Sequence, residues 1–208
     1  MELLDITDRD GISMREAITQ AGHEVNAIPQ IARNPADVLG YVEVHIEQGP
    51  VLLQHDLPVG IVTSIAGSSR YQVEFRGVAS HSGTTPMSMR KDAAAAAAEI
   101  ILYVEQRCAQ DQHASLVGTV GQLQVPSGST NVIPGRCVFS LDIRAAADTV
   151  REAAVADILQ HIADVCARRN IEYKAELSVS APAAPCAPWL MKHCLLYTSD
   201  AADDSLRV

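Results

Sequence analysis

The chain has 208 residues, of which 48% are apolar and 20% are charged, the mixture expected of a globular protein with one large or two small domains. The formal net charge is -9 and no block of Lys or Arg stands out, which argues against a nucleic-acid-binding protein. No apolar run reaches about 18 residues, the length that a membrane-spanning helix needs, so we expect no membrane protein.

The cysteines and the N-terminus both favour a cytoplasmic protein. The five cysteines are odd in number and form no CxxC pair, a pattern typical of reduced, mostly buried thiols; they are Cys108, Cys137, Cys166, Cys186 and Cys194. The first residues lack the basic and apolar regions of a secretory signal peptide.

Residues 1–62 begin with a helix signal and continue with a strand pattern. Ser13-Met14-Arg15-Glu16 has the form of a capping box and predicts a short helix that ends near Gly22. A loop rich in Pro and Asn follows. Residues 41–47 then alternate between apolar and polar side chains, which predicts a half-buried strand ended by Gly49-Pro50. Residues 60–65 are interpreted as the next strand or a linker.

His45 lies between two glutamates on the polar face of that predicted strand. A strand end that presents His and Glu is a good place for a metal ion. The alternative is a histidine that is satisfied by ordinary hydrogen bonds.

Residues 66–180 predict a second, self-contained pattern. Strands are expected at 71–75, 116–125, 137–144 and 171–179, and helices at 92–107 and from a second capping box at 149–152. The order strand, helix, strand, strand, helix, strand is that of the ferredoxin-like βαββαβ arrangement. The predicted fold class is therefore α+β.

The end of the chain has a different character. Three prolines between 182 and 188 indicate a return to the first domain, and the segment after about Lys192 has no helical stripe of apolar residues. We expect a foreign tail there, with a divergent disordered C-terminus as the alternative. The expected domains are residues 1–65, 66–180 and 181–192, followed by the tail at 193–208.

Four blocks of sequence, taken in order and spacing, point to one family. They are His45-Ile46-Glu47-Gln48-Gly49-Pro50, Ser80-His81-Ser82-Gly83-Thr84-Thr85-Pro86-Met87, Asn131-Val132-Ile133-Pro134-Gly135 and Asp142-Ile143-Arg144. Together they resemble the hydantoinase/carbamoylase branch of the M20 metallo-amidohydrolases, over about residues 3 to 190. That branch includes allantoate amidohydrolases, N-carbamoyl-L-amino acid hydrolases and β-ureidopropionases.

The resemblance implies a domain organisation and a chemistry. Residues 1–65 would be the end of the first segment of an α/β metallohydrolase catalytic domain, and residues 66–180 an inserted lid and dimerisation domain. The family uses two divalent metal ions, such as Zn, Mn, Co or Ni, and a bridging water that attacks a ureido carbonyl, with release of ammonia and CO2. The expected substrate is allantoate or an N-carbamoyl-L-amino acid, with a slight preference for allantoate, and the expected assembly is a homodimer.

The resemblance also implies a role for each candidate site residue. His45 would be a terminal metal ligand, and Gln48 would touch the substrate. His81 would donate to the developing oxyanion, often in the partner subunit's site. The alternatives are a strand-end hydrogen bond for Gln48 and an ordinary loop position for His81.

Asn131 and Arg144 match family residues that hold the substrate carboxylate, which an Arg guanidinium can bind through two hydrogen bonds. Alternatively, Asn131 is a turn residue and Arg144 is a surface strand residue that pairs with Asp142. The turn Ser68-Ser69-Arg70 departs from relatives that carry Gln or Arg there, which leaves the specificity contacts of that turn open.

Several family residues have no counterpart in the chain, namely the first His and Asp ligands, the catalytic Glu pair and the last His ligand. The sequence is therefore expected to be the middle of an enzyme and to be inactive alone. Two other functions stay open at this point: an M20 aminoacylase or peptidase, and a non-catalytic dimerisation or binding module made of residues 66–180.

Overall fold

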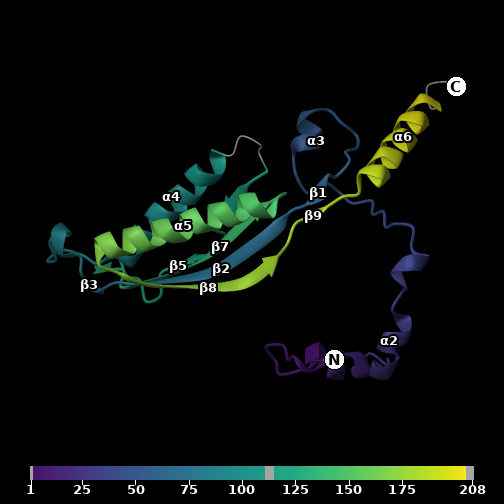
Figure 1. Cartoon of the computed structure of the whole chain (residues 1–208). Helices are drawn as coiled ribbons and strands as arrows, with labels where there is room; N and C mark the ends of the chain where they lie inside the picture. Colours follow the sequence, from purple (N-terminus) through teal and green to yellow (C-terminus); the bar gives the residue numbers. More distant parts are fainter. Residues whose placement is uncertain (1, 111–114, 205–208) are drawn as a thin grey trace. The chain divides into compact units, whose positions relative to one another are not determined.

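The computed structural model describes residues 2–110 and 115–204, and it divides into two compact units, Met1–Leu57 and Pro58–Val208. The chain combines helices with a sheet, as the sequence predicts (Figure 1). In the part of the chain that the structure describes, no helix is both long and apolar enough to cross a membrane.

The first unit consists of short helices. They are η1 (Glu2–Asp5), α1 (Met14–Gln20), η2 (Val25–Ala27), α2 (Ile28–Ile31), η3 (Pro35–Asp37) and α3 (Val51–Gln54). The capping box of α1 is confirmed: the Glu16 amide donates to Ser13 Oγ over 3.2 Å, and the Ser13 amide donates to the Glu16 carboxylate over 2.8 Å. The chain leaves this helix through Gly22, whose φ of +83° is a conformation that glycine adopts readily.

The strand predicted at residues 41–47 is wrong for this structure. These residues have no regular secondary structure, and the apolar side chains of Val42, Val44 and Ile46 are 60%, 99% and 75% exposed. A strand needs a neighbour for its backbone hydrogen bonds, and residues 2–57 contain no strand that could serve as one.

The second unit holds all the named strands of the described chain. In order, its elements are β1 (Ser64–Ile65), β2 (Gly67–Arg76), β3 (Ser80–His81), η4 (Met87–Met89), α4 (Ala93–Ala109), β4 (Val117–Thr119), β5 (Leu123–Gln124), β6 (Val132–Ile133), β7 (Arg136–Ala145), α5 (Asp148–Arg169), β8 (Glu172–Ala181), β9 (Ala184–Pro185) and α6 (Pro188–Asp204).

The main sheet is antiparallel, with the strand order β4-β7-β2-β8. Strand β5 also pairs with β7, at residues nearer the start of β7 than those that pair with β4. The central strands β2 and β7 are paired over their whole length, from Gly67 opposite Ala145 to Arg76 opposite Arg136. Two further short ladders lie off this sheet: β1 pairs with β9, and β3 pairs with β6. Figure 1 shows β3 at the opposite end of the main sheet from β1 and β9.

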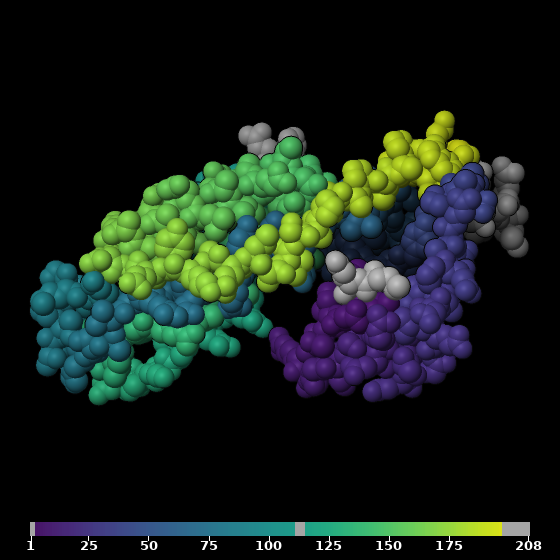
Figure 2. All heavy atoms as spheres, turned by 60° about the horizontal axis from the view of Figure 1, so that its bottom comes forward, coloured from purple at the N-terminus to yellow at the C-terminus, as the bar shows by residue number. Residues whose placement is uncertain are grey.

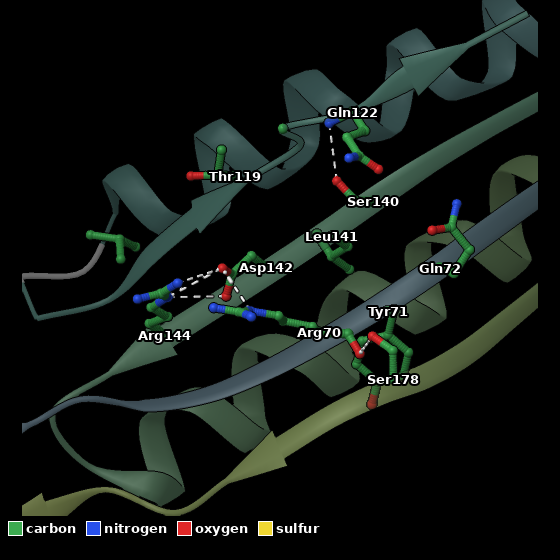
Figure 3. A pocket seen from close by; sticks show the side chains of 12 residues that line it. Arg70, Tyr71, Gln72, Thr119, Gln122, Ser140, Leu141, Asp142, Arg144 and Ser178 are labelled. Carbon is green, nitrogen blue, oxygen red and sulfur yellow. Dashed lines mark hydrogen bonds and ion pairs between the residues drawn. The ribbon is translucent and has the colours of Figure 1, made fainter. Parts of the chain in front are cut away.

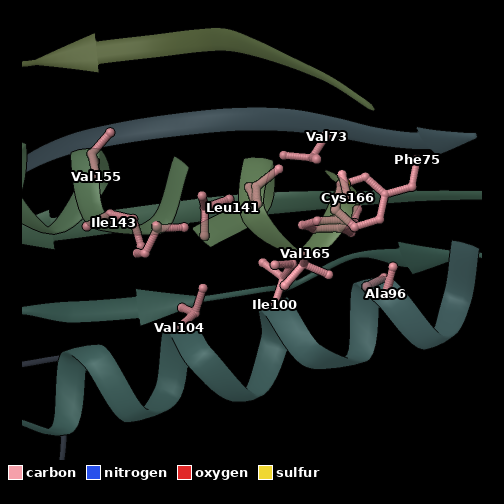
Figure 4. Close-up of a cluster of buried hydrophobic side chains, with 14 of the residues drawn as sticks. Val73, Phe75, Ala96, Ile100, Val104, Leu141, Ile143, Val155, Val165 and Cys166 are labelled. Carbon is pink, nitrogen blue, oxygen red and sulfur yellow. The ribbon is translucent and has the colours of Figure 1, made fainter. Parts of the chain in front are cut away.

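Helices α4 and α5 lie on one face of the sheet and enclose the hydrophobic core with it (Figure 4). Alternate residues of the central strands point into this core, among them Val73 and Phe75 of β2 and Phe139, Leu141 and Ile143 of β7, all fully buried. The buried alanines of α4 (Ala93, Ala96 and Ala97) let its backbone approach the strands closely. The opposite face of the sheet carries polar side chains.

Most of the predicted elements of this unit are confirmed, with two differences. The strand expected at 116–125 is two short strands, β4 and β5. The capping box expected at 149–152 is wrong. Helix α5 begins at Asp148, and its N-cap residue Ala147 has no side chain that could cap the helix. Arg151, within the expected box, donates a buried hydrogen bond to Ser69. On β8, Leu177 and Val179 are 54% and 39% exposed, because this strand lies at the sheet edge.

Residues 193–204, the described part of the expected tail, are helical rather than irregular. Helix α6 begins at Pro188 and continues to Asp204. The last four positions of the expected tail, 205–208, lie outside the described residues, and the origin of the tail stays a prediction.

Candidate functional site

His45 and Gln48 lie in the first unit, in the exposed segment before α3. Nδ1 of His45 is 2.5 Å from the Ile46 carbonyl oxygen, so this nitrogen donates, and in a neutral imidazole Nε2 then carries the lone pair. Gln48 has a φ of +55°, in the left-handed region, at the turn into Gly49-Pro50. The Glu47 carboxylate accepts from the Val51 and Leu52 amides over 2.9 and 3.1 Å and so caps α3.

His81 lies in the second unit, on the short β3–β6 ladder that projects beyond the main sheet. It pairs with Val132, and the neighbouring Ser80 pairs with Ile133. The turn after it is braced by Arg90, which donates from Nη2 to the Ser82 carbonyl over 2.7 Å and from Nε to the Thr85 carbonyl over 3.1 Å. The side chain of His81 is exposed, and hydrogen bonds hold the turn that follows it in place.

The hydrogen bond at Nδ1 determines which nitrogen of His81 is free to donate. The Gly83 amide donates to Nδ1 over 3.0 Å, so Nδ1 is an acceptor. In a neutral imidazole the other nitrogen then carries the proton. Nε2–H of His81 is thus the available donor, and the ring is exposed at the end of the second unit.

Asn131 lies beside His81, because its neighbour Val132 pairs with His81 in the β3–β6 ladder. Its carbonyl accepts from the Ser82 amide over 3.0 Å, and its side-chain Oδ1 accepts from Ser129 Oγ over 3.0 Å. The chain then passes through Gly135, where an added Cβ would lie 2.6 Å from the Ala79 amide nitrogen. This close approach of two backbones fixes the loop of Asn131 against the strand that leads to His81. Figure 2 shows the surface of this part of the chain, with the segment around His81 in blue to teal and the segment around Asn131 in green.

Arg144 lies at the other end of the main sheet, near the end of β7. It forms the pair with Asp142 that the sequence left open: Nε is 3.1 and 3.2 Å from the two carboxylate oxygens, and Nη2 is 2.8 Å from Oδ2. Arg70, directly opposite Asp142 on β2, donates from Nε to the same Oδ2 over 3.2 Å (Figure 3). Two guanidinium groups therefore share one carboxylate.

This arginine–carboxylate–arginine cluster has a clear electrostatic effect. The hydrogen bond from Arg144, together with the charges of both arginines, lowers the pKa of the Asp142 carboxyl although partial burial opposes the shift. In turn, the hydrogen bond and the charge of Asp142 raise the pKa of Arg144. With two guanidinium groups and one carboxylate, the cluster carries a net charge of one positive unit.

The cluster lies in a shallow depression on the polar face of the sheet, with a volume of about 600 Å³. Gln72, Ser140 and Thr119 contribute polar side chains to the same depression (Figure 3). A site of this composition suits a small polar anion, because guanidinium groups and neutral hydrogen-bonding groups surround it.

The candidate residues of the second unit therefore fall into two groups. His81 and Asn131 lie together beyond the start of β7, whereas Arg144 lies eight positions after Arg136, the first residue of that strand. At ~3.3 Å per strand residue, this separation is about 26 Å. A small ureido carboxylate cannot contact both groups in one copy of the chain.

The chain offers one candidate ligand for a metal ion but no complete site. Within residues 2–110 and 115–204, no three His, Cys, Asp or Glu side chains are close enough to hold an ion together. A catalytic zinc site needs three protein ligands. The free Nε2 of His45 suits one such ligand, because a ligating histidine normally donates its other nitrogen to a carbonyl or carboxylate.

The sequence did not reveal the supporting residues of either group. Arg90, Arg70 and Asp142 acquire their contacts from strand pairing and from a turn. Of these three, Asp142 lies within a family block, and the sequence predicts it as a partner of Arg144 but gives no sign of Arg70.

Comparisons with known proteins agree with the family blocks. The family model of the M20 peptidase dimerisation domain matches residues 63–174. An N-carbamoyl-L-amino acid amidohydrolase of Geobacillus stearothermophilus is 45% identical over 175 residues, which cover 84% of this chain and 42% of that enzyme. Allantoate deiminase 1 of Glycine max is 37% identical over 202 residues, which cover 88% of this chain and 42% of that enzyme.

The solved structures give the same result. The chain resembles the crystal structure of a hydantoinase/carbamoylase family amidase from Burkholderia ambifaria with a TM-score of 0.73 and 31% identity, over 92% of this chain and 46% of that one. The chain thus spans less than half of the length of the relatives it matches. By its sequence blocks, its matched domain and its fold, the chain belongs to the hydantoinase/carbamoylase branch of the M20 family of amidohydrolases.

Proposed function

We propose that the chain is part of an amidohydrolase that cleaves the ureido C–N bond of an N-carbamoyl-L-amino acid or of allantoate, with release of ammonia and CO2. The relatives named for these two activities support this substrate class. The observation that carries the proposal is the guanidinium of Arg144, which already holds a carboxylate through both Nε and Nη2 in an open polar depression. A substrate carboxylate can be bound in the same geometry.

The other candidate residues complete the proposed site. Nε2–H of His81 would donate to the oxyanion that forms when the ureido carbonyl is attacked, and a fixed donor at that position can contribute several kcal/mol, about 3 or more. The side-chain amide of Asn131 would bind the same substrate molecule beside His81. Gln48 would add a hydrogen bond from the catalytic domain.

The two groups of residues would meet in a homodimer. Because Arg144 lies about 26 Å from the end of β7 nearest to His81 and Asn131, one site would take Arg144 from one subunit and His81 with Asn131 from its partner. The match to a dimerisation domain supports this arrangement. Residues 66–180 would then be a ferredoxin-like lid, as the order of its strands and helices supports.

The remaining parts of the catalytic domain would come from sequence that the relatives have and this chain does not align with. His45 would supply one ligand to a pair of divalent metal ions, such as Zn, Mn, Co or Ni, whose remaining ligands the described residues do not supply. When bound, the metals would activate the water that attacks the ureido carbonyl. The exposed apolar residues of the first unit would be covered within that domain, and a cytoplasmic location fits the cysteine pattern.

Exchange of subunits between two inactive variants tests the shared site. Residues 64–185 would replace the corresponding segment of the Geobacillus enzyme, and dimers carrying His81→Ala in one subunit and Arg144→Gln in the other would be purified through two different tags. With a shared site, one of the two sites has both residues, so turnover per dimer should be about half that of the unsubstituted dimer. Each homodimeric variant should be nearly inactive.

The matched control pairs an unsubstituted subunit with one that carries both substitutions. With a shared site this dimer should be inactive, because each site then lacks one residue, whereas a site within one subunit would give half activity. The opposite pattern in the two heterodimers would contradict the shared site. Loss of activity in every chimera, with the dimer intact, would favour a non-catalytic dimerisation module.

A further inference from the structure

We propose that a substrate carboxylate exchanges with the Asp142 carboxylate at Arg144, and that Arg70 holds Asp142 after this exchange. Asp142 occupies the Arg144 guanidinium while the site is empty, and it shifts fully onto Arg70 when a substrate carboxylate binds. Arg70 is then a positioning residue that acts on the substrate through Asp142. This inference rests on the proposed role of Arg144.

The contacts show a carboxylate held between two competing donors. Asp142 makes its closest contacts with Arg144, through Nη2 over 2.8 Å and Nε over 3.1 Å, and a longer one with Arg70 Nε over 3.2 Å. Arg144 follows Asp142 by two positions on the same strand, whereas Arg70 faces it across the ladder. The carboxylate therefore has a second partner within reach when the first is taken by another anion.

Charge and exposure also favour exchange. Two guanidinium groups face one carboxylate, so an incoming carboxylate makes the cluster neutral. The side chains of Arg144 and Arg70 are 44% and 46% exposed, and Asp142 is 27% exposed, so an anion in the depression can reach Arg144 without opening the core. An exposed ion pair stabilises a protein only weakly, so a ligand of the same chemistry can replace it.

A second cluster of the same composition on this sheet lacks the depression and serves as a control. Glu74 accepts from Arg76 over 2.6 Å and from Arg136 over 2.9 and 3.0 Å. Its carboxylate is 18% exposed, and none of its three residues lines the depression. Substitution there changes the charge of the chain without touching Arg144.

The exchange makes predictions of opposite sign. Asp142→Asn removes the competing anion and should tighten carboxylate binding about threefold to fivefold, the effect of one partly exposed ion pair. Arg70→Gln leaves Asp142 with no second partner and should weaken binding by a similar factor. In the Asp142→Asn background, Arg70→Gln should change binding little, because Arg70 acts through Asp142.

The experiment uses the 208-residue chain, with N-carbamoylglycine as the probe and N-methylurea as the uncharged control. Nitrogen-15 NMR of the arginine Nε–Hε groups gives the dissociation constant and reports on Arg70 and Arg144 separately. We expect both resonances to move with N-carbamoylglycine, the Arg70 shift to vanish in Asp142→Asn, and Glu74→Gln to leave the affinity unchanged. Circular dichroism checks that each variant is folded.

The outcomes separate the two hypotheses. If Arg144→Gln does not reduce the affinity for N-carbamoylglycine, the proposed role of Arg144 fails, and the exchange fails with it. If Arg144 is required but Arg70→Gln weakens binding equally in the native chain and in the Asp142→Asn variant, Arg70 acts directly on the ligand. In that case the exchange alone is overturned.

Discussion

Replacement of Arg151 by methionine should destabilise the second unit by about 2–4 kcal/mol. Arg151 is 4% exposed, and its guanidinium donates to Ser69 Oγ over 3.0 Å, to the Ala181 carbonyl over 3.1 Å and to the Asp148 carboxylate. It thus joins the first turn of α5 to β2 and β8. Gly67 leaves room for this group, because a Cβ there would lie 1.9 Å from Nη1.

The magnitude follows from the partners that methionine leaves behind. Methionine removes a donor from Ser69 Oγ, whose residue is 7% exposed, and from the carbonyl of Ala181, which is half-buried. A buried polar group without a partner costs about 1–3 kcal/mol. Asp148 keeps the hydrogen bond from the Ala183 amide over 2.9 Å and is 36% exposed, so its contribution is small. The apolar stem of methionine retains most of the packing.

Urea unfolding of the 208-residue chain, followed by far-ultraviolet circular dichroism, measures this cost. Arg76→Met is the matched control, because Arg76 also pairs with a carboxylate but is 65% exposed, and its loss should cost no more than about 1 kcal/mol. If the two variants differ by less than about 0.5 kcal/mol, water replaces the lost donors and the reasoning is refuted.

Four further predictions concern the core, the pH dependence and the chemistry. Phe139→Ala should cost about 3–5 kcal/mol in the same assay, because the ring is fully buried and meets Phe75 edge-on at 5.2 Å; a cost below about 1 kcal/mol would contradict the core assignment. Two arginines lower the pKa of Glu74 from 4.5 to about 2, so its stabilising effect is present above pH 4.5 and is lost as the pH falls toward 2. The difference in stability between the native chain and Glu74→Gln should therefore shrink over that interval, and a constant difference would exclude this cause. The 208-residue chain should release no ammonia from N-carbamoyl amino acids with added Mn, Co, Ni or Zn, and turnover that depends on His45 would overturn this. In the chimera, His81→Ala should lower kcat with little change in KM, whereas a rise in KM alone would contradict the role of oxyanion donor.

Local sequence determined several helix starts and one central strand of this protein. The capping box at Ser13 begins α1, and Asp92 caps α4 by accepting from the Ala94 and Ala95 amides. The strand predicted at 137–144 forms β7, which buries every second residue from Cys137 to Ile143. In each case the information lies within a few neighbouring residues, and the fold only had to supply a surface to pack against.

Tertiary structure decided the rest, because the deciding partners are distant in sequence. Residues 41–47 alternate as a strand should, yet they form none, since alternation does not provide a neighbour for backbone hydrogen bonds. Strand pairing places His81 beside Asn131 near the start of β7. Arg144 lies about 26 Å along β7 from that start, although the family blocks imply one site. The same pairing brings Arg70 to Asp142 across 72 positions of the chain, a contact that no local pattern encodes.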